Sequence, residues 1–206
     1  MVIIPNYGCG NLASIIRMLE YCDIEARISN HPDDLFTTDK IILAGVGSFD
    51  YGMNSLNSNG WSEVMKELVK NDKISILGIC LGMQLMCNFS EEGQKEGLGW
   101  FDVGVKKFDF LDTSLKIPHM GWNSINKVEG NSDLFKSEKN AQKFYFVHSF
   151  HVDNPEAKCV AALTRYGYDF PSALQKDKLY GVQFHPEKSH RFGMNLLKNF
   201  CLENEK

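Results

Sequence analysis

Apolar residues recur with two different periods in the first half of the chain. Short apolar runs of strand length occupy residues 2–5, 24–28, 40–44 and 74–79. Between them, residues 11–22 and 61–70 carry apolar side chains at i, i+3, i+4 and i+7, the spacing of an amphipathic helix. Strands that alternate with helices predict an α/β protein with a central, mostly parallel sheet and helices on both faces.

The pattern changes after about residue 97. Strand-like segments follow one another at residues 100–108, 122–128, 144–148, 160–165, 172–175 and 179–184, joined by short turns rich in Gly, Asn and Pro. With no helix between most of them, we expect antiparallel pairing, either as an extension of the sheet or as a small second layer. Residues 190–203 read as a final helix, and residues 54–60 as the most flexible stretch.

Length, charge and hydropathy limit the classes of function. The chain has 206 residues, a net charge of −4 and 43% hydrophobic residues, which predicts one domain over residues 1–206. The acidic balance argues against binding nucleic acid through phosphate contacts. The apolar runs are too short to span a membrane, and the start of the chain lacks the charged region of a signal peptide. We therefore expect a cytoplasmic protein.

Six cysteines lie far apart, at positions 9, 22, 80, 87, 159 and 201. They form no C-x-x-C pair and do not cluster with histidines at metal-ligand spacing, so we expect no metal site. In a cytoplasmic protein the thiols would be reduced, and Cys22, Cys87, Cys159 and Cys201 would pack as small hydrophobic residues. Cys9, in a Gly-Cys-Gly turn, is expected to be exposed.

Cys80 stands out because it lies in Gly-Ile-Cys-Leu-Gly, between a buried strand and a helix. A tight strand-to-helix turn of this kind is typical of a nucleophile elbow, which pushes the central side chain out toward solvent. Glycines at positions 78 and 82 leave room for the turn, and the start of the following helix favours thiolate over thiol. A small apolar cysteine in an ordinary turn is the alternative interpretation.

A second segment supplies the partners that a cysteine nucleophile needs. His185 and Glu187 follow a predicted strand, with Pro186 stiffening the chain between them. His185 can act as the base, and Glu187 can orient its imidazole and stabilise the imidazolium. A His-x-Glu sequence can also be a surface pair or a turn. The other candidate bases, His119, His148 and His151, lack a carboxylate two residues further on.

A glycine loop follows the third predicted strand and would lie beside Cys80. In an open α/β sheet, ligands bind at the carboxyl ends of the strands. Main-chain N–H groups of Leu81 and of Val46 or Gly47 could then form an oxyanion hole. A plain turn is the alternative, and no phosphate-binding motif fits. Gln84 could hydrogen-bond a polar substrate or simply face solvent.

Several motifs together resemble one known family. Gly-Ile-Cys-Leu-Gly-Met-Gln at 78–84 and Val-Gln-Phe-His-Pro-Glu-Lys-Ser at 182–189 resemble the class I (triad) glutamine amidotransferases. The segments at 6–12, 45–49, 118–123 and 145–150 make the chain similar to the glutaminase subunits of imidazole glycerol phosphate synthase. The resemblance spans almost the whole chain. It implies a three-layer, flavodoxin-like fold and a Cys80–His185–Glu187 triad.

The resemblance also implies a substrate and a partner. L-Glutamine would be hydrolysed to glutamate and ammonia without a cofactor, and held by Gln84 and by the main chain at Gly47, Ser149 and Phe150. The ammonia would pass to a (β/α)₈-barrel cyclase that makes imidazole glycerol phosphate and aminoimidazole carboxamide ribotide in histidine biosynthesis. Five residues match positions at or near that interface: Tyr7, Asn11, Met120, Trp122 and Lys188.

Three residues depart from the usual motifs of this subfamily. Asn6 stands where Asp is usual, Ala44 where Pro is usual, and Phe150 where Tyr is usual. All three fall where the substrate pocket or the partner would be. They leave open a paralogous subunit that supplies ammonia for amidino modification of nonulosonic-acid surface sugars. A catalytically silent binding subunit and a cysteine peptidase or γ-glutamyl hydrolase on the same fold are further alternatives.

Overall fold

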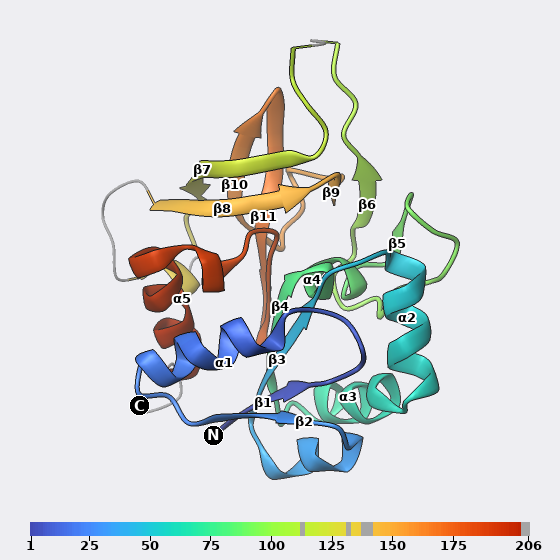
Figure 1. Cartoon of the computed structure of the whole chain (residues 1–206). Helices are drawn as coiled ribbons and strands as arrows, with labels where there is room; N and C mark the ends of the chain where they lie inside the picture. Colours follow the sequence, from blue (N-terminus) through green and yellow to red (C-terminus); the bar gives the residue numbers. More distant parts are fainter. Residues whose placement is uncertain (112–113, 131–132, 137–141, 203–206) are drawn as a thin grey trace.

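A computed structural model describes residues 1–111, 114–130, 133–136 and 142–202 (Figure 1). Within these residues, nine strands form one sheet in the order β2-β1-β3-β4-β12-β11-β10-β7-β8. The first five strands of this order pair in parallel, and the rest of the sheet is antiparallel. The α/β class, with a parallel sheet and an antiparallel extension in the C-terminal half, is confirmed.

The parallel half is a buried sheet whose strands carry apolar residues on both faces. Its strands are β2 (Ala26–Ser29), β1 (Val2–Pro5), β3 (Lys40–Gly45), β4 (Ser75–Cys80) and β12 (Leu179–Val182). In β3, Ile41 and Leu43 belong to one core cluster, while Ile42 and Ala44 belong to the other. This alternation requires cover on both faces of the sheet.

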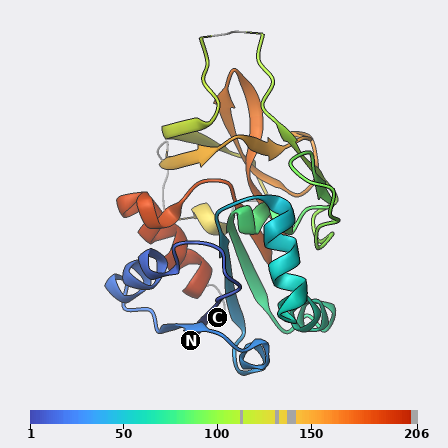
Figure 2. The ribbon, with the colours of Figure 1, turned by 45° about the vertical axis from the view of Figure 1, so that its right-hand side comes forward.

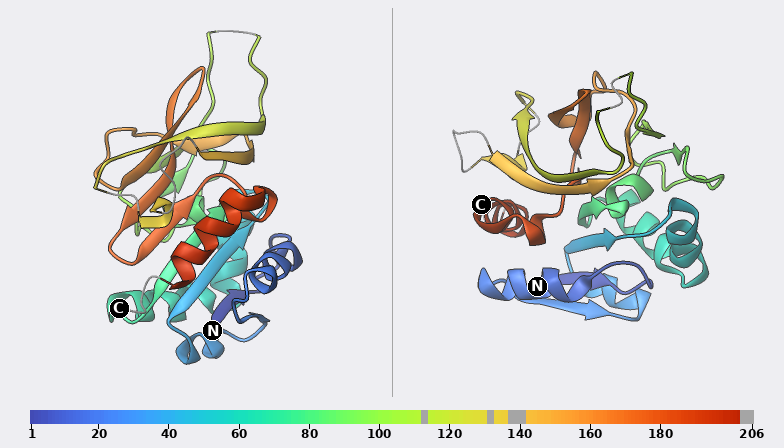
Figure 3. Two further views of the ribbon diagram at one scale, coloured as in Figure 1. Left: turned by 90° about the vertical axis from the view of Figure 1, so that its left-hand side faces the viewer. Right: turned by 45° about the horizontal axis from the view of Figure 1, so that its top comes forward.

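Helices provide that cover. On one side lie α1 (Leu12–Tyr21) and α5 (His190–Leu202), seen together in front of the sheet in the left view of Figure 3. On the other lie α2 (Phe49–Ser58) and α3 (Trp61–Lys70), with the short α4 (Leu81–Leu85). Each helix buries an apolar stripe in the cluster of its own side, for example Leu196 and Phe200 of α5. The result is a three-layer domain core.

The antiparallel half of the sheet rises beyond the carboxyl ends of the parallel strands (Figure 2). It consists of β11 (Tyr168–Lys176), β10 (Val160–Tyr166), β7 (His119–Lys127) and β8 (Gln142–His148). A separate small sheet of β5 (Phe89–Ser90), β6 (Gly104–Lys107) and β9 (Phe150–Val152) lies next to it. Both alternatives for this half, a sheet extension and a second layer, are therefore present.

Most of the expected elements are confirmed, and two expectations are wrong. Residues 54–60 are not a flexible stretch, because α2 covers residues 49–58 and its Met53 and Leu56 are buried. Residues 100–108 form a strand only at 104–107, and the rest of that segment is irregular. The last helix ends at Leu202, and position 203 of its expected range lies outside the described residues. No helix of the described part is long and apolar enough to cross a membrane.

Candidate active site

Cys80 lies at the junction of β4 and α4, in a backbone conformation that few side chains adopt. Its φ is 54° and its ψ is −110°. The turn tolerates no side chain at Gly82, where a Cβ atom would lie 1.7 Å from the carbonyl oxygen of Leu43 on the neighbouring strand. A Cβ at Gly78 would lie 2.6 Å from the Met86 sulfur. The two glycines thus make the sharp turn possible, as the sequence predicts.

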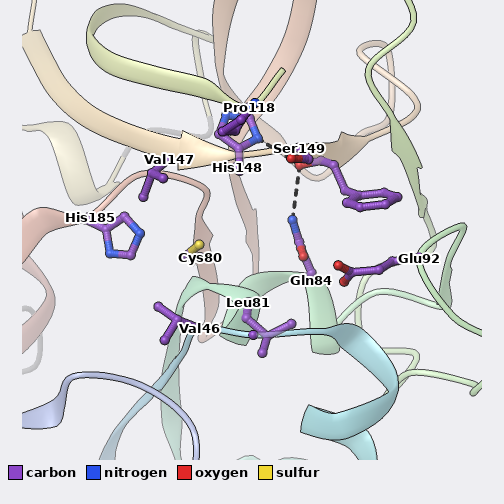
Figure 4. Close-up of a pocket in the computed structure, with 12 residues that line it drawn as sticks. Val46, Cys80, Leu81, Gln84, Glu92, Pro118, Val147, His148, Ser149 and His185 are labelled. Atoms are coloured by element: carbon purple, nitrogen blue, oxygen red, sulfur yellow. Dashed lines mark hydrogen bonds between the residues drawn. The ribbon is translucent and has the colours of Figure 1, made fainter. Parts of the chain in front are cut away.

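The sulfur of Cys80 does not face open solvent. Cys80 is only 8% exposed, which corrects the expectation that the turn pushes it outward into water. It lines a cavity of about 340 Å³ under the antiparallel half of the sheet (Figure 4). A cavity of this size is within the range of small-molecule sites and would remove most of a bound amino acid from water.

His185 and Glu187 form a buried hydrogen-bonded pair. The imidazole Nδ1 donates to Glu187 Oε1 over 2.7 Å, and the two side chains are 3% and 5% exposed. This bond places the proton on Nδ1 and leaves Nε2 directed at the cavity. Among the described residues Nε2 has no hydrogen-bond partner, and Figure 4 shows the ring facing Cys80. The triad expected from the sequence is therefore assembled in space.

The charge balance around His185 favours its protonated form. Burial alone would lower the pKa of the imidazole, but the Cys80 sulfur and the Glu187 carboxylate together outweigh it and raise the pKa to about 9. At neutral pH the ring is then protonated, as an imidazolium between the Cys80 sulfur and the Glu187 carboxyl group. This is the arrangement that makes a cysteine sulfur nucleophilic.

The loop that carries the pair is held at three points. The main-chain N–H of His185 donates to the carbonyl of Tyr145 on β8 over 2.9 Å. The hydroxyl of Ser189 donates to the His185 carbonyl over 2.6 Å and accepts from the Tyr145 N–H at 3.0 Å. These bonds fix His185 relative to the sheet, so its imidazole has little freedom to move away from Cys80.

The three rival histidines are buried and uncharged. Burial lowers the pKa of His119 and of His151 to about 4, and that of His148 well below the ordinary value. Each has a ring nitrogen bonded to another group of the protein. His148 lines the cavity, whereas His119 and His151 do not. None of the three therefore has the charge or the carboxylate partner of His185.

The residues expected to bind the oxyanion and the substrate surround the same cavity. Val46, Gly47 and Leu81 are among the residues that line it, with Gly47 at a positive φ of 121°. Gln84 is 5% exposed, so it does not face solvent, and it lines the cavity together with Ser149 and Phe150. Its Nε2 donates to the Phe150 carbonyl over 3.2 Å and to Gln183 Oε1 over 3.0 Å. The structure thus brings together the predicted pocket residues.

A comparison with protein families identifies the family of this chain. The model of the family "Glutamine amidotransferase class-I" matches residues 3–204. The chain belongs to this family. Within it, imidazole glycerol phosphate synthase subunit HisH from Leptospira borgpetersenii is 45% identical over 98% of this chain and 99% of its own. Subunit HisH from Methanocaldococcus jannaschii is 43% identical over 97% of this chain and 98% of the relative. The chain is therefore also a member of this HisH subfamily.

Solved structures show the same fold at lower sequence identity. "Crystal structure of glutamine amidotransferase" matches with a TM-score of 0.75 and 17% identity, covering 98% of both chains. "Structure of PurLQS from Thermotoga maritima" matches with a TM-score of 0.75 and 16% identity, covering 100% of this chain and 98% of that one. These likenesses confirm the class I glutamine amidotransferase fold.

Two polar residues at or beside this cavity escaped the sequence analysis. Gln183 is fully buried on the loop after β12, and its Nε2 donates to the Cys80 sulfur over 3.8 Å. Glu92 lies at the cavity mouth, where its Oε2 accepts from the N–H of Phe49 at 2.8 Å. Gln183 precedes the triad histidine by two residues, so strand alternation could have found it. Glu92 lies in a loop without periodicity, and no sequence signal pointed to it.

Four of the five expected interface residues are at the surface, and one is not. Met120 and Trp122 on β7 are 62% and 47% exposed, and Asn11 and Lys188 are also exposed. Trp122 stacks on His190 with nearly parallel rings 5.4 Å apart. Tyr7 is only 1% exposed, so its side chain cannot contact a partner in this conformation. Tyr7 follows β1, which is an interior strand of the sheet, and its side chain packs into the hydrophobic core on one side of that sheet.

Two further expectations from the sequence concern the exposure of Cys9 and the binding of a metal ion. Cys9 is 4% exposed, which corrects the expectation that the Gly-Cys-Gly turn presents it to solvent. Burial raises the pKa of its thiol, so it is a poor rival to Cys80. The described residues contain no group of three or more His, Cys, Asp or Glu side chains that could hold a metal ion.

Proposed function

We propose that this chain is the glutaminase subunit of an imidazole glycerol phosphate synthase, acting in histidine biosynthesis in the cytoplasm. It would hydrolyse L-glutamine to glutamate and ammonia and pass the ammonia to a (β/α)₈-barrel cyclase in a heterodimer. The observation that carries the proposal is the buried Cys80–His185–Glu187 arrangement at one cavity. Membership of the HisH subfamily over nearly the whole chain supports the choice of synthase.

The first half-reaction uses the charge distribution of the triad. The Cys80 thiolate attacks the side-chain amide carbon of glutamine, and a C–S bond forms. The main-chain N–H groups of Leu81 and of Val46 or Gly47 are proposed to stabilise the negative oxygen of the tetrahedral intermediate. The His185 imidazolium then gives its proton to the departing nitrogen, the C–N bond breaks, and ammonia leaves. A γ-glutamyl thioester remains on Cys80.

The second half-reaction restores the enzyme. His185 is now neutral, and its Nε2 accepts a proton from a water molecule that attacks the thioester carbon. The C–S bond breaks and glutamate is released, so Cys80 is again a thiolate and His185 an imidazolium. Glu187 stays hydrogen-bonded to Nδ1 over 2.7 Å throughout and holds the ring in one tautomer.

The cavity offers polar groups at several sides of a bound glutamine. Gln84 and the main chain at Gly47, Ser149 and Phe150 are proposed to hold the substrate. The carboxylate of Glu92 at the cavity mouth is suited to the α-amino group, because it is the acidic side chain among the lining residues. The amide carbon would then lie at the deep end of the cavity beside Cys80.

The proposed partner site lies where the exposed side chains of β7 come close to the catalytic loop. Met120, Trp122, Asn11 and Lys188 are exposed and are proposed to contact the cyclase. Met120 and Trp122 face β8 residues Val147 and Tyr145 across the ladder, and Val147 also lines the cavity. Ammonia released at Cys80 would therefore have a short distance to travel to the partner.

The decisive experiment measures glutamate release from glutamine with and without the purified cyclase subunit and its ligand. The protein with Cys80→Ala should form no glutamate under either condition. Cys159→Ala is the matched control, because Cys159 lines a different cavity and should leave activity unchanged. Full activity of the Cys80→Ala protein would overturn the proposed chemistry. Activity that does not respond to the cyclase would overturn the proposed partner.

A second destination for the ammonia stays open because of three residues. Asn6, Ala44 and Phe150 depart from the usual motifs near the pocket and the partner face. A paralogue that supplies ammonia for amidino modification of nonulosonic-acid sugars would share the same triad. Complementation of a histidine auxotroph separates the two, because only a partner of the histidine-pathway cyclase restores growth.

A further inference from the structure

Beyond the triad, a chain of hydrogen bonds connects β7 to the wall of the substrate cavity. His119 and His148 lie directly opposite each other in the β7–β8 ladder, and His119 Nδ1 is 3.0 Å from His148 Nε2. His148 Nδ1 is 2.8 Å from the carbonyl oxygen of Phe150. At the other end, Asn123 Nδ2 is 3.2 Å from His119 Nε2. The chain thus runs from Asn123 to Phe150 through two imidazoles.

The hydrogen-bond donors of this chain can be assigned from both ends. The Phe150 carbonyl can only accept, so His148 carries its proton on Nδ1 and its Nε2 accepts. The Asn123 amide is oriented by its bonds to the Ser124 N–H and the Arg165 carbonyl, so Nδ2 donates to His119 Nε2. His119 therefore carries its proton on Nδ1 and donates to His148. The assignments from the two ends agree: each hydrogen bond is donated in the direction from Asn123 to Phe150, and both imidazole rings are neutral.

The surroundings of the two rings keep them in place and uncharged. His119 stacks between Phe146 and Tyr166, with ring centroids 4.7 and 4.1 Å away. The two histidines are 3% and 6% exposed, and burial lowers the pKa of both imidazoles. If either ring were protonated, two N–H donors would face each other, so this series of hydrogen bonds forms only when both imidazoles are neutral.

The end of the chain is part of the proposed glutamine site. The Phe150 carbonyl that His148 holds also accepts from Gln84 Nε2 at 3.2 Å, and the bonds at His148 and Gln84 are drawn in Figure 4. Gln84 Nε2 also donates to Gln183 Oε1, and Gln183 Nε2 donates to the Cys80 sulfur. The segment 149–150 is therefore held by a donor on β8, His148, which in turn accepts a hydrogen bond from His119 on β7.

We propose that His119 and His148 are positioning residues for glutamine. As two neutral imidazoles joined by a hydrogen bond, they fix the Phe150 carbonyl against Gln84. This also fixes the segment 149–150, which is proposed to bind the substrate. This role rests on the proposed glutaminase function. It also connects that segment to the strand that carries Met120 and Trp122. Neither histidine touches the reacting atoms, so the effect is on substrate binding more than on the chemical step.

Two substitutions at His119 separate hydrogen bonding from packing. His119→Phe keeps a flat ring between Phe146 and Tyr166 but has no donor for His148. In His119→Asn the amide nitrogen can take the place of Nδ1 and donate to His148. We expect His119→Phe to raise KM for glutamine about tenfold, with a much smaller change in kcat. His119→Asn should restore KM to within about threefold of the wild-type value. Thermal unfolding of both proteins verifies that they fold.

The results separate this proposal from the glutaminase proposal. Hydrolysis by the wild-type protein tests the glutaminase function, whereas the difference between the two variants tests the positioning role. A wild-type KM in His119→Phe would overturn the positioning role, and so would an equal rise of KM in both variants, which would show packing alone. If wild-type protein neither hydrolyses nor binds glutamine by calorimetry, both proposals fail.

Nitrogen NMR gives a readout that is independent of activity. Two-bond ¹H–¹⁵N correlation spectra of the wild-type protein at neutral pH should show His119 and His148 with the proton on Nδ1. In His119→Phe the signal of His148 should move, because its Nε2 loses the donor. A proton on Nε2 of His148 in the wild-type protein, or a charged ring, would overturn the proposed chain even if glutamine is hydrolysed normally.

Discussion

Gln183 donates a hydrogen bond through Nε2 to the sulfur of Cys80 over 3.8 Å, while its Oε1 accepts from Gln84 at 3.0 Å. One amide thus contacts both the nucleophile and a residue of the substrate pocket. It is fully buried, so no water can replace either bond without a rearrangement. This makes Gln183 the residue on which the environment of the sulfur most directly depends.

Gln183→Leu should lower kcat/KM for glutamine roughly ten- to a hundredfold, the range that one hydrogen bond to a charged group supports. The leucine removes the donor to the thiolate and leaves the Gln84 amide with one acceptor fewer. Gln183→Glu is the informative companion, because it keeps an acceptor for Gln84 but places a negative charge beside the sulfur. It should be at least as impaired. Steady-state glutamate release measures both, and normal activity of either protein would contradict this role.

The pH dependence of activity should show a descending limb near the pKa of His185. Its imidazolium has to protonate the leaving nitrogen, and the pKa of this group is raised to about 9. We therefore expect kcat/KM to fall as pH rises through about 9. Glu187→Gln removes the charge that favours the imidazolium, so its limb should move to lower pH. An unchanged limb in Glu187→Gln would contradict the assignment.

The same raised pKa has a consequence for stability. The folded protein holds a proton on His185 that the unfolded chain releases near pH 6.5. Because the folded pKa is the higher one, the stabilisation is fully present below about pH 6.5 and is lost as pH rises through about 9. The difference in melting temperature between wild type and Glu187→Gln should therefore shrink across this window in scanning calorimetry.

Glu92→Gln tests the proposed contact with the α-amino group of glutamine. In this variant the amide oxygen at position 92 can still accept from the Phe49 N–H, but the side chain lacks the charge that would attract the ammonium group of the substrate. We expect KM to rise about fivefold, the upper end for one solvent-accessible ion pair, with kcat nearly unchanged. The neighbouring Glu91→Gln is the control, because Glu91 does not line this cavity. Equal effects of the two changes would indicate a general charge effect.

Tyr7→Phe should leave the free energy of unfolding unchanged or raise it by up to about 1 kcal/mol. The Tyr7 hydroxyl is buried without a hydrogen-bond partner in the described part of the chain, so its removal relieves a desolvated polar group. Tyr168→Phe provides the contrast, because the Tyr168 hydroxyl is 2.8 Å from His151 Nε2. That protein should lose about 1 kcal/mol. Urea unfolding measures both, and a clear loss for Tyr7→Phe would reveal a partner for its hydroxyl.

Gly82→Ala should destabilise the protein by about 3 kcal/mol and reduce its activity, because the new methyl group would collide with the main chain of β3. The added carbon would lie 1.7 Å from the Leu43 carbonyl oxygen, and a strand in the sheet interior cannot move aside. Gly52→Ala in α2 is the control, since its nearest neighbours are Leu side-chain methyls at 3.1–3.2 Å, which can adjust. Similar thermal stability of both variants would contradict this view of the turn.

Local sequence patterns predicted the parallel half of the fold well. The strand at residues 2–5 and the helix at 61–70 end where the apolar period ends, so β1 and α3 match the expected ranges. Helix α2 was missed because Gly52 and several asparagines and serines interrupt its apolar stripe. These residues have low helix propensity, and the burial of Met53 and Leu56 outweighs it. Only the tertiary contacts with α3 and α4 reveal that stripe.

The residues of the proposed triad could be picked out in the sequence because they lie on short, stiff segments. Cys80 lies between two obligatory glycines, and His185 and Glu187 flank a proline. The exposure of side chains was harder to predict. The sequence placed Cys9 and Cys80 in turns, but both are buried. Cys80 shares its cavity with residues 147–150, which are distant along the chain. For the same reason Glu92 and Gln183 entered the site only with the structure.

The position of β12 between β4 and β11 has a consequence for the order in which the enzyme is completed. Ribosomes deliver the chain from its N-terminus, so β4 with its cysteine and all four strands of the antiparallel half emerge before β12 does. Until residues 179–185 have been synthesised, the two halves of the sheet have no common strand and His185 is absent. An unfinished chain that ends before these residues contains Cys80 but neither β12 nor His185, so under the proposed mechanism it would not hydrolyse glutamine.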